Sequence, residues 1–201
     1  MKLLIMGPAG SGKGTISAEI IKEFSLQHIS CGDEIRKEIK SGSDLGKEMK
    51  ELSEKGILIS DDKIIKLMTK ATPKDNFIWD GFPRTLYQAQ EIDKILSIDK
   101  AILLEVPEEE VIDRLTKRVQ CKSCGRIFGR DFQEKTKGVC DSCSGELYQR
   151  PDDKEESIKK RLDIYKEETV PVIGFYKNKI IKINAHQNVA LIVKETLEAL
   201  R

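Results

Sequence analysis

The chain lacks the features of a membrane or secreted protein. No apolar run approaches the length that spans a bilayer, and the first residues lack the apolar segment of a signal peptide. Neither sign of charge dominates, because 35 Lys and Arg against 34 Asp and Glu leave a net charge of +1. That balance gives no global electrostatic case for a nucleic-acid or anionic-membrane partner, so any polyanion site must be local. We therefore expect a soluble cytoplasmic protein.

Repeats and low-complexity tracts are also absent, and 201 residues suffice for one well-buried core with small insertions. Five short apolar runs are mostly separated by helix-length segments, which is typical of an α/β fold with a parallel sheet. These runs are residues 2–6, 26–30, 76–80, 101–106 and 179–184. Residues 187–200 carry apolar side chains at helical spacing and predict a final helix that packs on the core. Two segments interrupt the alternation: 31–74, with at least two helical patterns, and 119–152, with a β-like pattern.

Histidine is scarce, and the spacing of His28 and His186 suggests no ligand pair, so neither is assigned a role. Cysteine is concentrated instead. Four of the five cysteines form two C-x-x-C pairs fifteen residues apart, namely Cys121 with Cys124 and Cys140 with Cys143. Such paired knuckles in a cytosolic chain predict a four-thiolate structural zinc site, with turns supplied by Gly125 and Gly138. Two disulfides, which a reducing cytosol disfavours, and an iron centre are the alternatives.

The strongest motif is Gly-Pro-Ala-Gly-Ser-Gly-Lys-Gly-Thr at residues 7–15. It follows an apolar strand pattern and precedes the helix-compatible stretch 16–24, which is the context of a P-loop. The glycines let backbone N–H groups converge on phosphate oxygens, and Lys13 would reach the β- and γ-phosphates of a nucleoside triphosphate. The hydroxyl that usually follows the lysine stands one residue later, at Thr15. A flexible Gly/Ser turn is the alternative, but the sequence predicts nucleotide-phosphate binding.

A second motif follows the third apolar run. Asp80 ends that run, near the edge of the sheet where the P-loop also lies, and can hold magnesium directly or through water. Arg84 stands in a turn fixed by Gly81 and Pro83, which can aim its guanidinium at a second phosphate. Alone, such an Asp is more often a cap or an ion-pair partner; beside a P-loop we interpret it as functional.

These motifs, with two more, resemble the adenylate kinase family of nucleoside monophosphate kinases over essentially the whole chain. The matching motifs are residues 7–15, Gly32-Asp33-x2-Arg36, residues 80–85 with Gln88, and Arg150-x-Asp152-Asp153-x7-Arg161. The resemblance implies an enzyme that transfers a phosphoryl group reversibly from ATP to AMP with Mg²⁺, giving two ADP. The four-cysteine insert resembles the zinc-binding lid of many bacterial members. A P-loop fold of three layers and a monomeric state are also implied.

The resemblance divides the chain into three parts. They are a core (1–29, 60–118 and 153–201), an AMP-binding insert (30–59) and a zinc-binding lid (119–152). Cations must gather on the transferring phosphoryl because two polyanions meet there; Lys13, Arg84, Arg118, Arg150 and Arg161 are the implied catalytic residues. The lid must exclude water from the transfer. Asp152 and Asp153 match an acidic pair at the lid hinge.

The resemblance also implies the nucleotide contacts. Those to ATP are Gly10, Ser11, Gly12, Lys13, Gly14, Thr15, Arg114, Arg118, Ile127, Phe128 and Gln187. Those to AMP are Cys31, Arg36, Ile57, Leu58, Ile59, Gly81, Phe82, Pro83, Arg84, Gln88, Arg150 and Arg161. Two positions depart from the family: Cys31 replaces a hydroxyl residue beside the AMP base, and Ala185 replaces a glycine beside the ATP base.

Three alternatives to an ATP:AMP transferase remain at this stage. A GTP:AMP kinase and a pyrimidine monophosphate kinase belong to the same class, since pocket contacts alone choose the base. Gln88 favours adenine as acceptor, because related pyrimidine kinases resemble an asparagine pattern there. A zinc-ribbon module that binds nucleic acid and carries a nucleotide switch belongs to a different class. The near-neutral charge and the lack of a basic, aromatic-rich patch around the knuckles speak against that module.

Overall fold

Five parallel strands form the central sheet of the computed structural model, which describes residues 1–54, 57, 59–129 and 132–201. The strands are β1 (Lys2–Met6), β2 (Gln27–Ser30), β3 (Phe77–Asp80), β4 (Lys100–Glu105) and β8 (Ile180–Asn184). Their order across the sheet is β2-β3-β1-β4-β8, with every neighbouring pair parallel. Each of the five predicted runs is therefore a strand, and its bounds differ by at most one residue from those expected.

Helices follow the strands in the expected alternation. They are α1 (Lys13–Phe24), α2 (Cys31–Ser41), α3 (Asp44–Glu54), α4 (Asp61–Ala71), α5 (Leu86–Asp93), α6 (Glu108–Thr116), α7 (Glu155–Ile164), α8 (Val170–Phe175) and α9 (Val189–Leu200). The predicted first and last helices are α1 and α9, and the insertion at 31–74 contains α2, α3 and α4. Side-chain caps fix several starts; the Asn188 side chain, for example, accepts a hydrogen bond from the Ala190 N–H at 2.8 Å before α9.

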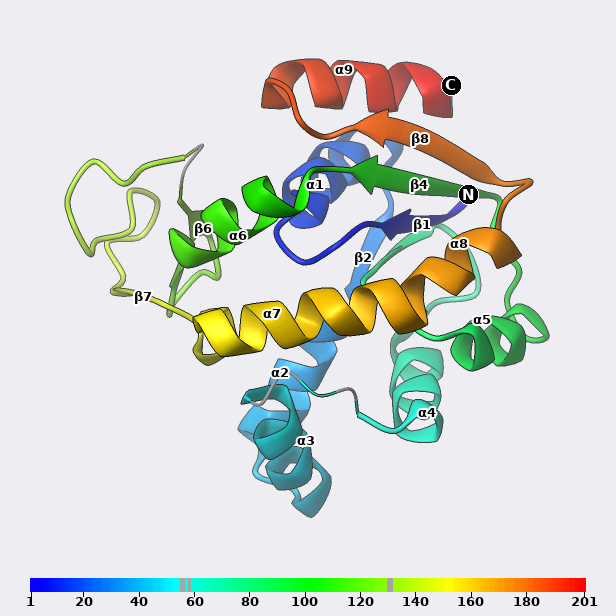
Figure 1. Ribbon diagram of the computed structural model, residues 1–201, viewed down its shortest axis with the longest axis horizontal. Coiled ribbons are helices and arrows are strands. Elements are labelled where there is room, and N and C mark those ends of the chain that lie inside the picture. Colours follow the sequence, from blue (N-terminus) through cyan, green and yellow to red (C-terminus); the bar gives the residue numbers. More distant parts are fainter. Residues whose placement is uncertain (55–56, 58, 130–131) are drawn as a thin grey trace.

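The sheet is buried on both faces, as parallel sheets usually are. Alternate residues of β1 point to opposite sides: Leu3 and Ile5 pack in a cluster with residues of α1 and α9. Leu4 and Met6 pack in a second cluster with residues of α4, α5 and α8. Figure 1 shows α9 beside the sheet on one side and α7 with α8 running across the other. The arrangement is the predicted three-layer α/β fold.

The carboxyl ends of the strands bring the two main motifs together. In the register of the sheet, Ile5 of β1 and Ser30 of β2 both lie beside Asp80 of β3. The glycine-rich loop after β1, the start of α2 and the turn after β3 therefore share one edge. Chains of this topology bind ligands in the crevice outside such an edge.

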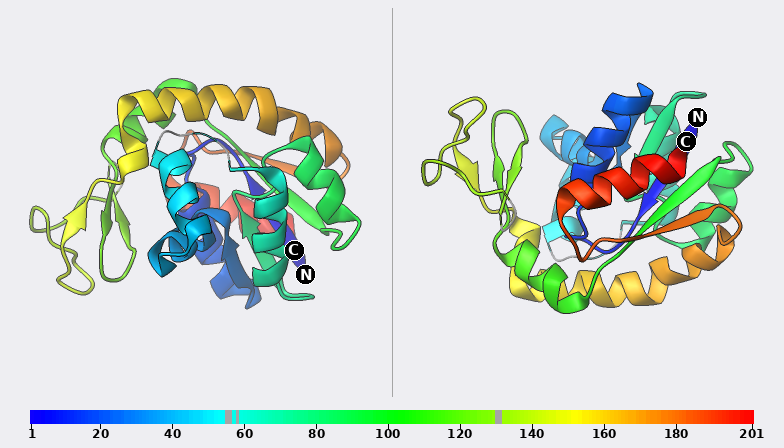
Figure 2. Two further views of the ribbon diagram at one scale, coloured as in Figure 1. Left: turned by 90° about the horizontal axis from the view of Figure 1, so that it is seen from below. Right: turned by 90° about the horizontal axis from the view of Figure 1, so that it is seen from above.

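A second, much smaller sheet occupies the insertion at 119–152, in agreement with its β-like pattern. It is antiparallel, in the order β6-β5-β7, and consists of β5 (Val119–Cys121), β6 (Ile127–Phe128) and β7 (Leu147–Tyr148). We call residues 119–152 the lid. In both views of Figure 2 it projects from one end of the molecule, away from the central sheet.

One nearly continuous helical run leads from the lid back to the core. After the short turn η1 (Pro151–Asp153) come α7, the π-helical turn η2 (Tyr165–Thr169) and α8. Pro171 at the start of α8 has no N–H to donate, which accounts for the change in hydrogen bonding at that point. None of the helices in the described part of the chain has the length and apolar character that crossing a membrane requires.

Candidate active site and metal centre

A cavity of about 1020 Å³ opens where the carboxyl edge of the sheet, the lid and α7 meet. It is lined by every predicted ATP contact except Gln187, from the loop residues 10–15 to the lid residues Ile127 and Phe128. Gln187 instead donates from its side-chain amide to Glu195 Oε2 at 2.7 Å. Every described AMP contact also lines the cavity, while Leu58 lies outside the described residues. One cavity therefore brings both predicted sets together.

The loop between β1 and α1 has the geometry that a phosphate cradle needs. Gly7 has a φ of +144°, and a Cβ there would lie 2.9 Å from the Leu104 carbonyl oxygen, so only glycine fits. Gly12 (φ +94°) caps α1, and its carbonyl accepts the N–H groups of Thr15 and Ile16 at 3.0 and 3.1 Å. The N-terminal end of α1, with its positive dipole, thus faces the cavity.

Lys13 is the buried cation of this loop. Its ammonium group donates to the carbonyl oxygens of Gly7 and Pro8 at 2.8 and 2.7 Å. The pKa of Lys13 is lowered to about 8, chiefly by burial and also by the nearby positive charges of Arg84 and Arg161, against the opposing effect of Asp80. The arginine charges contribute to this lowering of the pKa, and a polyanion bound in the cavity would offset them.

Two carboxylates at the lid hinge hold two of the predicted arginines. Arg118 binds the buried Asp153 through two hydrogen bonds, from Nε to Oδ2 at 2.7 Å and from Nη2 to Oδ1 at 2.5 Å. Arg161 Nη1 donates to Asp152 Oδ2 at 2.8 Å. Burial disfavours the charged form of Asp152, yet Arg161 and Arg118 outweigh it and lower the pKa of that carboxyl. The predicted acidic pair therefore fixes guanidinium groups in the cavity.

Arg150 and Arg36 complete the group of cations. Arg150 Nε donates to the side-chain oxygen of Gln120 in β5 at 2.7 Å. Burial, together with the charges of Arg118 and Arg36, lowers the pKa of Arg150 to about 10. Arg36 pairs with Asp33 one turn earlier in α2. Arginines from separate elements thus converge on a single space with Lys13, namely Arg36, Arg84, Arg118, Arg150 and Arg161.

Arg84, in the turn after β3, takes part in three hydrogen bonds with residues of that turn, of α5 and of η2. Its Nε donates to the Gly81 carbonyl at 2.8 Å, and its backbone N–H donates to Gln88 Oε1 at 2.8 Å. The hydroxyl of Thr169, in η2, donates to the Arg84 carbonyl at 2.9 Å. Asp80, at the end of β3, lines the cavity with His28, whose Nε2 lies 3.4 Å from Asp80 Oδ2.

Arg114, in α6, also lines the cavity. Its guanidinium pairs with the buried Glu110 and donates to the carbonyl oxygen of Ala185 at 3.1 Å. Glu110 in turn contacts Nδ1 of His186. Arg114, one of the predicted ATP contacts, is therefore tied to the loop that follows β8.

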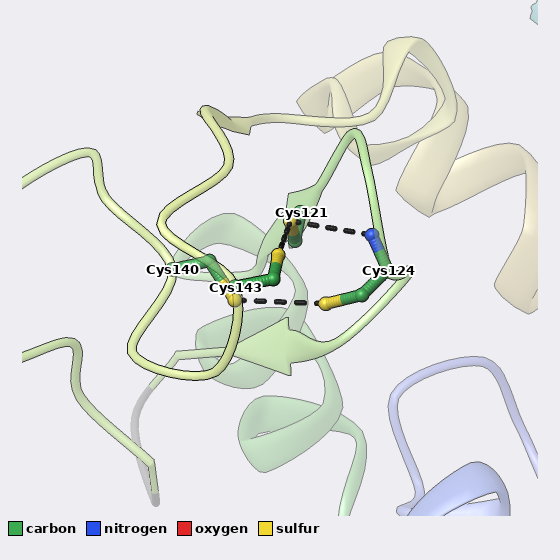
Figure 3. Close-up of side chains that lie close together, drawn as sticks. All are labelled: Cys121, Cys124, Cys140 and Cys143. Carbon is green, nitrogen blue, oxygen red and sulfur yellow. Dashed lines mark hydrogen bonds between the residues drawn. The ribbon is translucent and has the colours of Figure 1, made fainter.

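The four lid cysteines lie together in two loops that face each other (Figure 3). Their sulfur atoms all lie within 4.8 Å of one another, with Cys121 and Cys143 3.5 Å apart and Cys124 and Cys140 3.6 Å apart. A tetrahedral Zn²⁺ with Zn–S bonds of about 2.3 Å needs S–S edges of about 3.8 Å. All four thiols are free, so the structure does not support the disulfide alternative.

Glycines shape these loops. Gly125 and Gly138 adopt φ values of +75° and +77°, as the turn prediction requires. Gly145 was not identified from the sequence, yet a Cβ there would lie 2.9 Å from Cys121 Sγ. The N–H of Cys124 donates to Cys121 Sγ, and this backbone hydrogen bond is the main reason that the pKa of the Cys121 thiol falls to about 6. The residues present fit a metal that prefers thiolates.

Besides Gln120 and Glu110, which bind Arg150 and Arg114, three more residues contact the predicted site although no motif contains them. They are His28 beside Asp80, Thr169 beside Arg84, and Asp61, whose Oδ1 accepts from Gln88 Nε2 at 2.7 Å. Each is more than twenty residues away from its partner in the sequence, so no local spacing could reveal it. Of these three residues, His28 could have been noticed, because it is a polar residue in the strand that pairs with the one ending in Asp80.

The site defines the class of protein. A phosphate loop at the start of α1 lies in one cavity with several cations and with the carboxylate that ends β3, which is typical of a P-loop protein that binds nucleotide phosphates.

The family model described as "Adenylate kinase" matches residues 5–181. The adenylate kinase of Caldicellulosiruptor bescii is 43% identical over 212 aligned positions, covering 100% of this chain and 99% of the relative. That of Treponema denticola is 44% identical over 92% of this chain and 90% of its own length. That of Carboxydothermus hydrogenoformans is 45% identical over 88% and 87%. The chain belongs to the adenylate kinase family.

Proposed function

We propose that this chain catalyses the reversible, magnesium-dependent transfer of a phosphoryl group from ATP to AMP, giving two ADP. A phosphate oxygen of AMP attacks the γ-phosphorus of ATP, and the bond from that phosphorus to the β–γ bridging oxygen breaks. The observation that carries the proposal is the single cavity that joins the phosphate loop to Arg84 and Gln88. Two phosphate-binding features in one space suit a direct transfer between two nucleotides.

The roles of the residues follow from their positions. The loop residues Gly10 to Thr15 and Arg114 would bind ATP, with Lys13 on its β- and γ-phosphates. Arg36 and Arg84 would hold the AMP phosphate, and Gln88 would bind the adenine edge. Arg118, Arg150 and Arg161 would neutralise the charge that develops on the transferring phosphoryl. The pairing of Arg118 and Arg161 with Asp153 and Asp152 supports this role, because it fixes the guanidinium groups before the substrates arrive.

Two metals are part of the proposal. Asp80 would hold Mg²⁺, most simply through water, since its hard oxygen donors and its place beside the phosphate loop suit that ion. When bound, Mg²⁺ neutralises phosphate charge. The four lid cysteines would hold one structural Zn²⁺, which the cluster of free thiols supports and which would stabilise a lid with little apolar core.

We also propose that the core, the AMP-binding insert (30–59) and the lid (119–152) are separate units, with the lid closing over ATP to exclude water. Both predicted substrate sites come from one chain, which supports a monomer. The free thiols suit a reducing compartment such as the cytoplasm.

A crossed assay tests the function. ATP, GTP and CTP are each combined with AMP, GMP, UMP and CMP, and kcat/KM is measured for every pair. We expect ATP with AMP to be the best pair and two ADP to be its product. In Gln88→Leu we expect a higher KM for AMP and a weaker preference for it, because the buried amide no longer reads the base. A better rate with UMP or CMP would contradict the adenylate assignment.

A further inference from the structure

Gln88, the residue proposed to bind the acceptor base, is itself held by a small polar network. Its side chain is only 1% exposed, yet it lines the cavity. Its Nε2 donates to Asp61 Oδ1 at 2.7 Å, and its Oε1 accepts from the backbone N–H of Arg84 at 2.8 Å. The second carboxylate oxygen of Asp61 accepts from the Thr85 hydroxyl at 3.0 Å. Asp61, in the first turn of α4, is not among the residues that line the cavity, so its effect on a ligand would be indirect, through Gln88.

The chemistry of the two partners fixes which way the amide points. A carboxylate can only accept a hydrogen bond, and a backbone N–H can only donate one. If the Gln88 amide turned by 180°, its oxygen would face the Asp61 carboxylate and its nitrogen would face the Arg84 N–H. Two hydrogen bonds would become two repulsive contacts, in a place that water barely reaches. The orientation of the amide is therefore determined by its neighbours.

The network also determines what remains available to a ligand. The amide nitrogen has two hydrogens and the oxygen two lone pairs, and the network uses one of each. The cavity is thus offered one N–H donor next to one carbonyl acceptor. The edge of adenine presents the complement, an exocyclic amine beside a ring-nitrogen acceptor. Guanine and uracil present the reverse, a carbonyl oxygen beside a ring N–H.

We propose that Asp61 is a specificity-determining residue that positions the Gln88 amide for a 6-aminopurine and against bases with the reversed pattern. This inference rests on the proposed function, in which Gln88 binds the acceptor base. Cytosine also presents an amine beside a ring-nitrogen acceptor, so Asp61 does not discriminate against CMP, which the size of the pocket must exclude. The inference therefore separates the four acceptors into two pairs, AMP with CMP and GMP with UMP.

Asp61→Leu tests the inference, because leucine has a similar size and neither accepts nor donates. Values of kcat and KM are measured for the four acceptors with ATP as donor. We expect the AMP:GMP and AMP:UMP ratios of kcat/KM to fall by about 10-fold or more, the scale of one charge-assisted hydrogen bond. The AMP:CMP ratio should stay within about 3-fold, and the KM for ATP should not change. Equal losses with all four acceptors, or unchanged ratios, would overturn the inference.

Two further variants separate positioning from a general structural effect. Asp61→Asn keeps an oxygen that can accept from Gln88 and an amide that can donate to Thr85, so it should retain most of the wild-type selectivity. Asp62→Leu is the matched control, since Asp62 is the exposed next residue of the same helical turn and accepts a hydrogen bond from Tyr87 OH, at 3.4 Å, rather than from Gln88. It should leave all four ratios unchanged. A loss of selectivity in Asp62→Leu equal to that in Asp61→Leu would refute the proposed contact.

If Asp61→Leu does not fold, a single variant and a double variant at positions 88 and 61 test the same contact. Gln88→Glu places a second carboxylate against Asp61 and should lower kcat/KM for AMP. Adding Asp61→Asn restores a donor opposite the new carboxylate and should recover at least about 5-fold. No recovery would overturn the inference. The proposed function fails separately, if the wild-type protein does not prefer AMP in the crossed assay.

Discussion

The central sheet and the lid each hold a few strands in place, but they differ in what is buried around those strands. In the sheet, β1 and β3 are almost wholly buried, and two clusters of apolar side chains cover its two faces. In the lid, the buried cluster among the described residues is Cys121, Phe128 and Cys140, with Val119 and Leu147 partly buried against it. Two of those three buried residues are metal-ligand candidates rather than packing residues.

The difference shows how the two regions can be stabilised independently. Apolar burial stabilises the sheet, and it does not depend on any ligand. The few buried side chains of the lid cannot offset the conformational entropy that is lost when the lid becomes ordered. The lid therefore needs cross-links between its loops. In the function proposed above, a metal bound by the four cysteines would supply them without tying the lid to the core, so that the lid could move as a unit. The predictions below test whether chemistry and metal binding are as separable as this comparison implies.

The largest effect should come from the phosphate loop. We expect Lys13→Ala to lower kcat by about 10²- to 10³-fold, because it removes a preorganised charge from the transferring phosphates. Its zinc content and the thermal stability of the lid should not change. Lys22→Ala, at the exposed far end of the same helix, is the control and should be fully active. Near-normal turnover in Lys13→Ala would contradict the role given to the loop.

A substitution in the lid should have the opposite pattern of effects, with a loss of metal and a smaller loss of activity. Cys140→Ser should lower zinc affinity by at least about 100-fold, the upper end of what changes around a metal site cost. Hydrogen exchange should then show that the amides of the lid lose protection while those of β1, β3 and β4 stay protected. The kcat of this variant should be about 10-fold lower than that of the wild type. Ser142→Ala, an exposed change inside the same knuckle, should retain the metal. The idea fails if freshly purified, unchelated wild-type protein contains no zinc.

The two regions also differ in what the sequence could reveal. The strands, the phosphate loop and the cysteine pairs are local patterns, in which each residue is identified by its near neighbours. The strands agree with their expected bounds to within one residue, and the four cysteines lie together as their spacing predicts. The partners of those residues come from distant segments. Asp61 reaches Gln88, and Thr169 reaches Arg84, only because α4 and η2 pack beside the turn after β3. Tertiary packing determines such contacts, and no spacing rule encodes them.

The dependence of activity on pH should be determined by the core alone, because Lys13 lies there. The pKa of Lys13 is lowered to about 8, so its ammonium loses its charge as the pH rises through that value. We expect kcat/KM for ATP, which reports the free enzyme, to be constant below about pH 7.5 and to fall about 10-fold per unit well above pH 8. Cys140→Ser should show the same alkaline limb at a lower level. A flat profile to pH 9.5, or a shifted limb in Cys140→Ser, would contradict the assignment.

The smallest effect concerns the helical run that joins the two regions. The Thr169 hydroxyl donates to the Arg84 carbonyl from the π-helical turn, and Thr169 is nearly buried there. Thr169→Val keeps the shape and removes one hydrogen bond, which leaves the carbonyl without that partner. We expect the KM for AMP to rise about 2- to 10-fold, the cost of one neutral hydrogen bond, while the KM for ATP and the zinc content do not change. Thr169→Ser retains the hydroxyl and should restore the wild-type KM for AMP. If Thr169→Ser loses as much as Thr169→Val, the methyl group rather than the hydroxyl matters, and the helical run does not position Arg84 through this bond.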